Sequence, residues 1–196
     1  MAEAFRDFDV EVILVLRRQD ELAHSLYLEN IMKGSRRGRM SFSDFRKFIE
    51  SRHLRFEDNI ATFERVFGPV RVLTYEGLAR DNRLLQNFFA ELGFRVAGLE
   101  DSGLVRQSLT VRQARMKRAF LPLIGSHGQN RQVNRFLRWG PMARASARFV
   151  DEPETGFWEN ESARQRWLEC YAEENERIRS RFFPDRASLF SPGLDC

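Results

Sequence analysis

The sequence is poor in cysteine and has no long hydrophobic run, and each absence excludes a class of protein. Cys170 and Cys196 are the only cysteines among 196 residues, too few for a disulfide framework or a cysteine-rich metal cluster. The longest apolar run, Val12–Leu16, is far shorter than the roughly 18 to 20 residues that a transmembrane helix needs. The N-terminal residues are acidic and contain no small-residue cleavage site, so no secretory signal is predicted. We therefore expect a soluble, cytoplasmic protein without a metal site or a membrane span.

Lysine is also scarce, because Lys33, Lys47 and Lys117 are the only three lysines among 32 basic residues. Arginine supplies the rest, and its planar guanidinium binds carboxylates and phosphates through two parallel hydrogen bonds. A GC-rich coding sequence produces the same excess of arginine over lysine. The arginines also look spread along the chain rather than gathered on one face. We therefore favour compositional bias and expect no nucleic-acid partner, despite a formal net charge of +4.

Hydrophobic residues make up 42% of the chain and include 18 phenylalanines, so a sizeable core can be buried. The segment Val10–Leu16 is continuously apolar after Glu11, which is typical of a strand buried on both faces of a parallel sheet. A second, shorter strand is predicted over Val70–Tyr75.

Helices are predicted wherever apolar residues recur at intervals of three and four. Asp20 is the expected N-cap of the first helix, and Ser41 with Asp44 forms the expected capping pair of the second. The expected ranges are 20–33, 42–49, 56–67, 84–92, 108–120, 129–137 and 160–182. Segments 35–39 and 125–128 are predicted to be loops, the first of them mobile, and 141–156 to be irregular. Glu174 interrupts the apolar stripe of the last helix, whose inner face we expect to include Cys170.

The order strand, helices, strand, helix predicts an α/β fold with three layers and parallel strands joined by right-handed crossovers. We expect an α/β core over residues 1–104 and a mostly helical part of the same domain over 105–196. Two strands do not make a stable parallel sheet. The sheet that these residues predict is therefore incomplete.

The end of the first strand carries the most informative pattern. In open α/β sheets, ligands bind beyond the carboxyl ends of the strands. Arg17 lies at such an end, and Ser25 follows eight residues later on the next helix. A guanidinium group can neutralise a phosphate while a hydroxyl fixes its orientation. The alternative for Arg17 is a pair with a carboxylate, and serine also occurs on helices without any ligand. His24, which points away from Ser25 on a helix, is interpreted as a surface or packed residue.

Together with Tyr27, these residues resemble the sulfotransferases that use 3'-phosphoadenosine 5'-phosphosulfate (PAPS), above all the bacterial branch related to carbohydrate sulfotransferases. Further similar segments are Ser41–Phe45, Val66–Gly68, Val72–Leu78, Asn87–Gly93 and Tyr171–Asn175. The resemblance implies a P-loop-NTPase-like parallel sheet. It also implies that Arg17 and Ser25 bind the 3'-phosphate of PAPS or of its product, adenosine 3',5'-bisphosphate (PAP). The implied activity is transfer of a sulfuryl group to a hydroxyl of a carbohydrate or another small acceptor.

The chain also departs from this family. The family's phosphosulfate-binding loop and its catalytic base both precede the segment that contains the Arg and the Ser. No Gly-rich turn and no lysine occur before Val10 to supply that loop. The segment Gly125–Arg131 is a weak counterpart of the family's later basic, Gly-containing cofactor loop. We therefore expect a truncated enzyme that carries the 3'-phosphate half of the cofactor site and no catalytic residue, and whether it is active alone stays open.

The alternative is a non-catalytic α/β remnant or interaction module. An unpaired sheet edge would let it dimerise, or pair with another protein, by strand addition. Trp158 is interpreted as a core or interface residue, with an acceptor-binding surface as its alternative.

Overall fold

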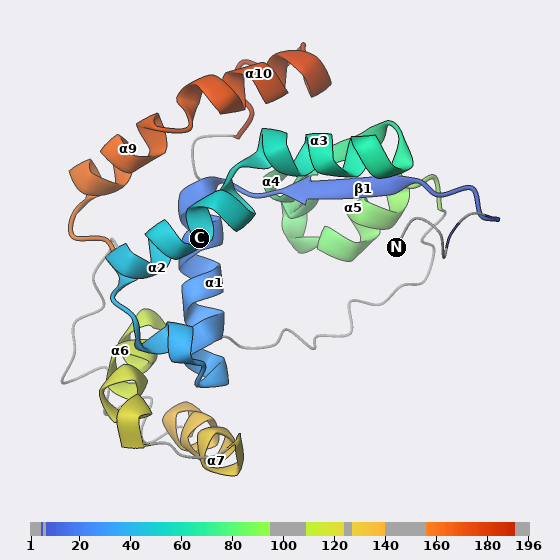
Figure 1. The fold of residues 1–196 in the computed structure, drawn as a ribbon. Coiled ribbons are helices and arrows are strands. Elements are labelled where there is room, and N and C mark those ends of the chain that lie inside the picture. The colour runs from blue at the N-terminus through green and yellow to red at the C-terminus, as the bar shows by residue number, and fades with distance from the viewer. Residues whose placement is uncertain (1–4, 6, 95–108, 124–126, 140–155, 191–196) are drawn as a thin grey trace. The chain divides into compact units, whose positions relative to one another are not determined.

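The computed structural model describes residues 5, 7–94, 109–123, 127–139 and 156–190 (Figure 1). These residues form an α/β structure that is mostly helical and contains a small parallel sheet of two strands. The chain divides into two compact units. Unit 1 comprises Met1–Arg18, Arg55–Val105 and Cys170–Cys196, and unit 2 comprises Gln19–Leu54 and Arg106–Glu169. The expected division of the domain at residues 104 and 105 stays a prediction.

Unit 1 is built on the two predicted strands, β1 (Val12–Leu16) and β2 (Val70–Thr74). They pair in parallel, with Val12 opposite Val70 and Leu16 opposite Thr74. Four of the five residues of β2 are buried, whereas β1 buries only Leu16 and leaves Val15 43% exposed. The prediction of the strand is confirmed, but the prediction that both its faces are buried is wrong for the described residues. A three-layer, P-loop-like sheet is not seen in them.

Helix α3 (Phe56–Phe67) contacts both strands, lies alongside β1 in Figure 1, and buries Phe56 and Ile60. It ends at Gly68, whose φ of +83° is accessible to glycine at little cost. The short helix α4 (Tyr75–Leu78) follows β2 directly. A 3₁₀ turn at Arg80–Asn82 then leads to α5 (Leu84–Glu91).

Helix α10 (Ala172–Phe182) brings the C-terminal part of the chain onto α3. Its Glu174 is buried, and Oε1 accepts a hydrogen bond of 2.8 Å from the backbone N–H of Glu57 in the first turn of α3. The other carboxylate oxygen lies 4.0 Å from Nη1 of Arg55. Because Arg55 makes no side-chain cap, Glu174 satisfies this helix end from 117 residues away. The residue that interrupts the predicted apolar stripe is therefore a cap.

A single helix over 160–182 is not what the structure contains. Helix α9 (Glu161–Glu169) ends before Cys170, and α10 begins at Ala172. The two helices belong to different units. Each helix packs within its own unit. Trp167 of α9 packs on Trp158 in unit 2, with ring centroids 5.0 Å apart, whereas Tyr171, just before α10, is buried in unit 1. Cys170, expected on the inner face, is exposed at this break.

Unit 2 is organised around α1 (Gln19–Lys33), which contacts α2 (Phe42–Ile49), α6 (Val111–Phe120), α7 (His127–Arg138) and α9. The buried face of α1 includes Ala23, Tyr27 and Ile31, spaced four residues apart. The Tyr27 hydroxyl donates a hydrogen bond of 2.6 Å to the carbonyl of Met40. The pKa of this hydroxyl is raised, chiefly because the ring is buried. Tyr27 is thus a satisfied core residue.

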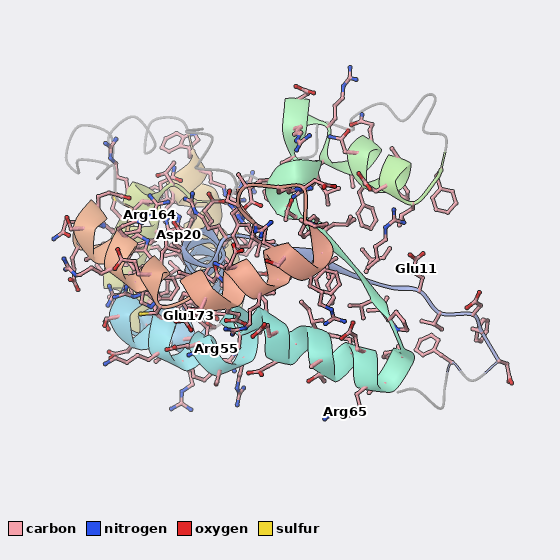
Figure 2. All side chains as sticks on the ribbon, turned by 90° about the horizontal axis from the view of Figure 1, so that it is seen from above. Glu11, Asp20, Arg55, Arg65, Arg164 and Glu173 are labelled. Carbon is pink, nitrogen blue, oxygen red and sulfur yellow. The ribbon has the colours of Figure 1, made fainter. Side chains whose placement is uncertain are left out.

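The first turn of α1 differs from the prediction. The helix begins at Gln19, so Asp20 lies inside its first turn rather than at its N-cap. The Asp20 side chain is buried and accepts a hydrogen bond of 2.6 Å from Nε of Arg164 on α9, as Figure 2 shows for these two labelled residues. A carboxylate at this place is also favoured by the partial positive charge of the helix N-terminus.

The segment between α1 and α2 is a capped 3₁₀ turn over Arg36–Arg39, not the mobile loop that was expected. Ser35 caps it by accepting a hydrogen bond from the Gly38 N–H. A Cβ on Gly38 would lie 2.6 Å from the carbonyl oxygen of Asn30, so only glycine allows this close approach. The predicted cap of α2 is confirmed, because Ser41 Oγ accepts from the Asp44 N–H at 3.0 Å.

Candidate functional site

The candidate site lies in unit 1, at the edge where both parallel strands end. Arg17 follows β1 and Tyr75 follows β2, directly after the paired residues Leu16 and Thr74. The guanidinium carbon of Arg17 lies 4.6 Å from the centre of the Tyr75 ring. Stacking of this kind fixes the plane of a guanidinium group. Arg17 is therefore held at the carboxyl edge of the sheet, where α/β proteins bind ligands.

A hydrogen bond also links the two chain segments that follow β1 and β2. The N–H of Arg18 donates a hydrogen bond of 3.1 Å to Oε1 of Glu76. Because Arg18 and Glu76 directly follow Arg17 and Tyr75, this bond fixes the two strand ends in register.

A second arginine reaches the same edge from the far end of the sequence. Nη1 of Arg186 donates a hydrogen bond of 3.1 Å to Oγ1 of Thr74, the buried last residue of β2. Its guanidinium carbon lies 4.2 Å from the ring centre of Phe183. A Cβ on Gly77 would lie 2.8 Å from that threonine oxygen, so the glycine leaves room for this contact. The edge thus combines two stacked guanidinium groups with a hydroxyl, which suits a phosphate or sulfate.

Ser25, the other predicted ligand residue, lies on α1 in unit 2, whereas Arg17 lies in unit 1. Its side chain is half-buried. The joint role of Arg17 and Ser25 at one phosphate stays a prediction. His24 packs edge-on against Phe157 with ring centroids 5.4 Å apart, as the packed interpretation predicts.

The remaining predicted features fall elsewhere. Trp158 is buried, and its ring centre lies 4.3 Å from the guanidinium carbon of Arg46. This burial agrees with a core role and not with an acceptor-binding surface. Within Gly125–Arg131, residues from His127 onward belong to α7, and 125–126 lie outside the described residues, as do Cys196 and 141–155. No cluster of three or more histidine, cysteine or acidic side chains suited to a metal occurs in the described part of the chain.

Arg186 is the site residue that sequence reasoning missed. It follows Pro184 and Asp185 in a turn after the last helix, a setting with no local sign of a ligand role. Only the packing of α10 against α3 brings it to Thr74, which is 112 residues away in sequence.

Comparison with protein families, curated proteins and solved structures finds no match to this chain. No helix among the described residues has the length and apolar character to cross a membrane. The functional conclusion therefore depends on the residues and geometry of the site.

Proposed function

We propose that this chain carries the 3'-phosphate half of the cofactor site of a PAPS-dependent sulfotransferase. The observation that supports the proposal most directly is the position of Arg17. It extends from the end of a parallel strand and stacks on Tyr75 at the end of the neighbouring strand. Two separate segments thereby present a cation at the edge where nucleotides bind in α/β proteins.

The proposed reaction transfers a sulfuryl group to a hydroxyl of a carbohydrate or another small acceptor. The acceptor oxygen forms a bond to sulfur and loses its proton to a base. The bond between sulfur and the phosphate oxygen of PAPS breaks, and PAP leaves with that electron pair. Arg17 and Ser25 bind the 3'-phosphate, which positions the donor for in-line attack. They supply orientation and charge neutralisation rather than proton transfer.

Arg186 extends this site beyond what the sequence predicts. Its contact with Thr74 places a second guanidinium group at the last residue of β2, the residue before the tyrosine on which Arg17 stacks. Two cations sharing one phosphate would bind it more tightly than a single arginine.

The proposal also fits the place of β1 in the sheet. In the two-stranded sheet of the described residues β1 is an edge strand, and its continuously apolar sequence is suited to a further parallel neighbour, as in the three-layer sheet of P-loop-like proteins. In the sulfotransferases that this chain resembles, a strand bearing the phosphosulfate loop would take that place.

Calorimetric titration with PAP tests the assignment. We expect the wild-type chain to bind PAP and Arg17→Ala to bind at least about tenfold more weakly, because a charge-assisted contact is lost. Arg65→Ala is the matched control, since Arg65 is an exposed arginine on α3 away from the strand ends (Figure 2). Equal affinity of Arg17→Ala and wild type would remove Arg17 from the site. Absence of binding by the wild-type chain would count against the function itself.

A second candidate function is self-association through β1, with a second copy of this chain as the partner. The observation in its favour is again the exposure of Val15 on an apolar strand in a two-stranded sheet. Light scattering should then show a dimer that Val15→Lys converts to a monomer, because a charge on that strand opposes pairing. A wild-type monomer across the concentration range would exclude this candidate.

A further inference from the structure

The charges of this chain are strongly segregated along the sequence. Between Asp101 and Asp151 there are nine arginines and one lysine and no acidic residue. The other 22 basic side chains are outnumbered by the 28 acidic ones. The arginines themselves are spread along the chain, since this quarter of it holds nine of the 29; what sets the segment apart is that no acidic residue accompanies its ten cations. A block of one charge sign is typical of a surface that binds a partner of the opposite sign.

Helices α6 and α7, with the 3₁₀ turn Leu121–Leu123 between them, form the described part of this basic segment. The side chain of Gln113 on α6 donates a hydrogen bond of 2.9 Å to the carbonyl of Leu137 on α7, and the two helices are in contact. They make a helical hairpin within unit 2.

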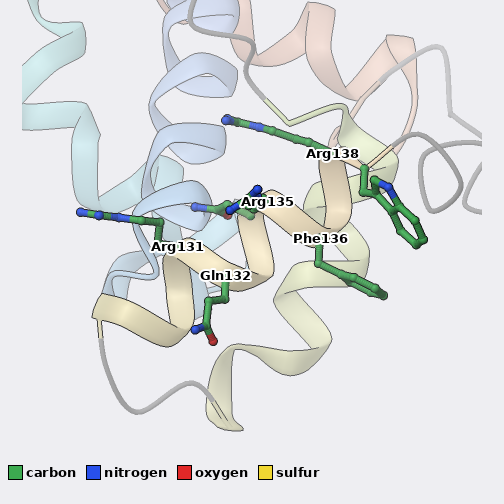
Figure 3. A pocket seen from close by; sticks show the side chains of 7 residues that line it. Arg131, Gln132, Arg135, Phe136 and Arg138 are labelled. Atoms are coloured by element: carbon green, nitrogen blue, oxygen red, sulfur yellow. The ribbon is translucent and has the colours of Figure 1, made fainter.

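The cations of α7 lie on one side of the helix. Arg131, Arg135 and Arg138 recur at intervals of four and three residues, and all three are exposed. In Figure 3 the labelled arginines point to one side of α7, whereas Phe136 points to the other. A hollow of about 790 Å³ on α7 is lined by these arginines and also by Phe136 and Trp139. The helix is thus amphipathic, and its three arginines lie together on its polar side.

The other side of the hairpin exposes large apolar side chains. Phe120 is 53% exposed, Leu123 79%, Phe136 52% and Trp139 60%. A groove of about 480 Å³ lies between the helices, and the apolar side chains that line it are Met116, Phe120, Leu123, Val133, Phe136 and Leu137. Single exposed apolar residues are ordinary, but a contiguous group beside a groove indicates a binding surface.

We propose that the α6–α7 hairpin binds the surface of an anionic lipid bilayer. Exposed phenylalanine, leucine and tryptophan can enter the headgroup and acyl boundary while the arginines contact anionic headgroups. Charge complementarity requires an anionic occupant, since this segment carries no acidic residue. Nucleic acid would satisfy the arginines but would leave the aliphatic part of the groove, such as Leu123 and Val133, without a partner. The apolar lining therefore favours lipid.

This proposal is independent of the sulfotransferase assignment, because the residues that carry it lie in the α6–α7 hairpin and include none of Arg17, Ser25 and Arg186. The proposed binding would keep the protein at a membrane surface without a spanning helix. It adds a binding surface that the resemblance does not imply.

Vesicle flotation tests the proposal. The full chain should float with vesicles of phosphatidylcholine containing about one third phosphatidylglycerol, remain unbound with phosphatidylcholine alone, and dissociate in about 1 M salt. Arg135→Ala should weaken binding about fivefold and Phe136→Ser about tenfold. The matched controls are Arg65→Ala and Leu85→Ser, an exposed arginine and an exposed leucine in unit 1, which should bind like wild type.

Two outcomes would overturn the proposal. One is absence of binding to the anionic vesicles, or equal binding to both kinds of vesicle. The other is tight binding of single-stranded RNA that Arg135→Ala weakens and Phe136→Ser leaves unchanged, which would identify a nucleic-acid surface instead. Circular dichroism of each variant separates loss of binding from loss of folding.

Discussion

Lys117 on α6 is a fully buried ammonium group that stabilises the end of another helix. Its Nζ donates hydrogen bonds of 2.7 Å to the carbonyl of Met32 and 2.6 Å to Oδ1 of Asn134. The side-chain amides of Asn130 and Asn134 also donate to the Met32 carbonyl, at 3.1 and 2.9 Å. These donors satisfy the C-terminal end of α1, where carbonyl groups have no partner within the helix.

The position of Lys117 predicts how stability depends on pH. Burial, and secondarily the charge of Arg138, lowers the pKa of Lys117 to about 8 from an ordinary 10.5. Between these values the unfolded chain binds more protons than the folded one, so the free energy of unfolding contributed by this group rises with pH. We expect the stability difference between wild type and Lys117→Met to shift in favour of wild type from about pH 8 to about pH 10.

Urea unfolding of both proteins across that range measures the difference. Comparing the two proteins cancels the titration of tyrosine and cysteine, which both contain. A difference that stays constant with pH would show that Lys117 keeps an ordinary pKa in the folded protein.

Several charged residues show why side-chain roles were hard to predict. Asp20 looks like a helix cap and Glu174 like an interruption of an apolar face, but both are buried and paired across long stretches of sequence. Their partners, Arg164 and the N-terminal turn of α3, lie 144 and 117 residues away. Local pattern carries no information on such pairs, because burial of a charge depends on what the fold brings to it.

At the scale of single elements, local signals were reliable. Helix α3 has the predicted bounds, and the Ser41 cap of α2 is confirmed. Gly93, which directly follows the helix predicted over 84–92, has a φ of +79° just after α5. These features depend on residues within one or two turns of each other, so the sequence pattern suffices to predict them.

The start of α6 allows such a local signal to be tested. Thr110 accepts a hydrogen bond from the Gln113 N–H while the Gln113 side chain accepts one from the Thr110 N–H, which completes a capping box. Thr110→Ala should lower the free energy of unfolding by about 1 kcal/mol. Thr110→Ser keeps the hydroxyl and serves as the matched control.

Chemical denaturation followed by circular dichroism compares these two variants with wild type. Equal destabilisation by alanine and serine would show that the methyl group of Thr110 matters and the cap does not.

At the scale of the whole molecule, unit 1 is assembled from three separate stretches of the chain. Helix α10 contacts α3 and buries Ile178, which is 2% exposed. Charged pairs such as Arg177 with Glu57, at 2.7 Å, lie at the exposed rim of this contact. Most of the stabilisation should therefore come from the apolar centre, since exposed ion pairs contribute little.

This arrangement predicts that a change near the C-terminus destabilises the unit that contains the N-terminal strand. Ile178→Ala should lower the free energy of unfolding by about 2–5 kcal/mol, and Ile178→Val by about 0.5–1.5 kcal/mol. Arg177→Ala, at the exposed rim, should leave it nearly unchanged, because solvent screens the pair with Glu57. Urea titration gives all three values, and an alanine variant as stable as wild type would contradict the packing of α10 on α3.

The amino-acid sequence by itself determined most helix bounds, both strands, and the position of Arg17 at a strand end, because periodicity, caps and β-branched runs act over short distances. Tertiary structure alone decided which long-range partners meet: Arg186 with Thr74, Glu174 with α3, and Asp20 with Arg164. It also decided that the predicted terminal helix divides, because each half packs in a different unit. Such contacts join residues more than 100 positions apart, and their energies arise from burial and pairing that no local pattern encodes.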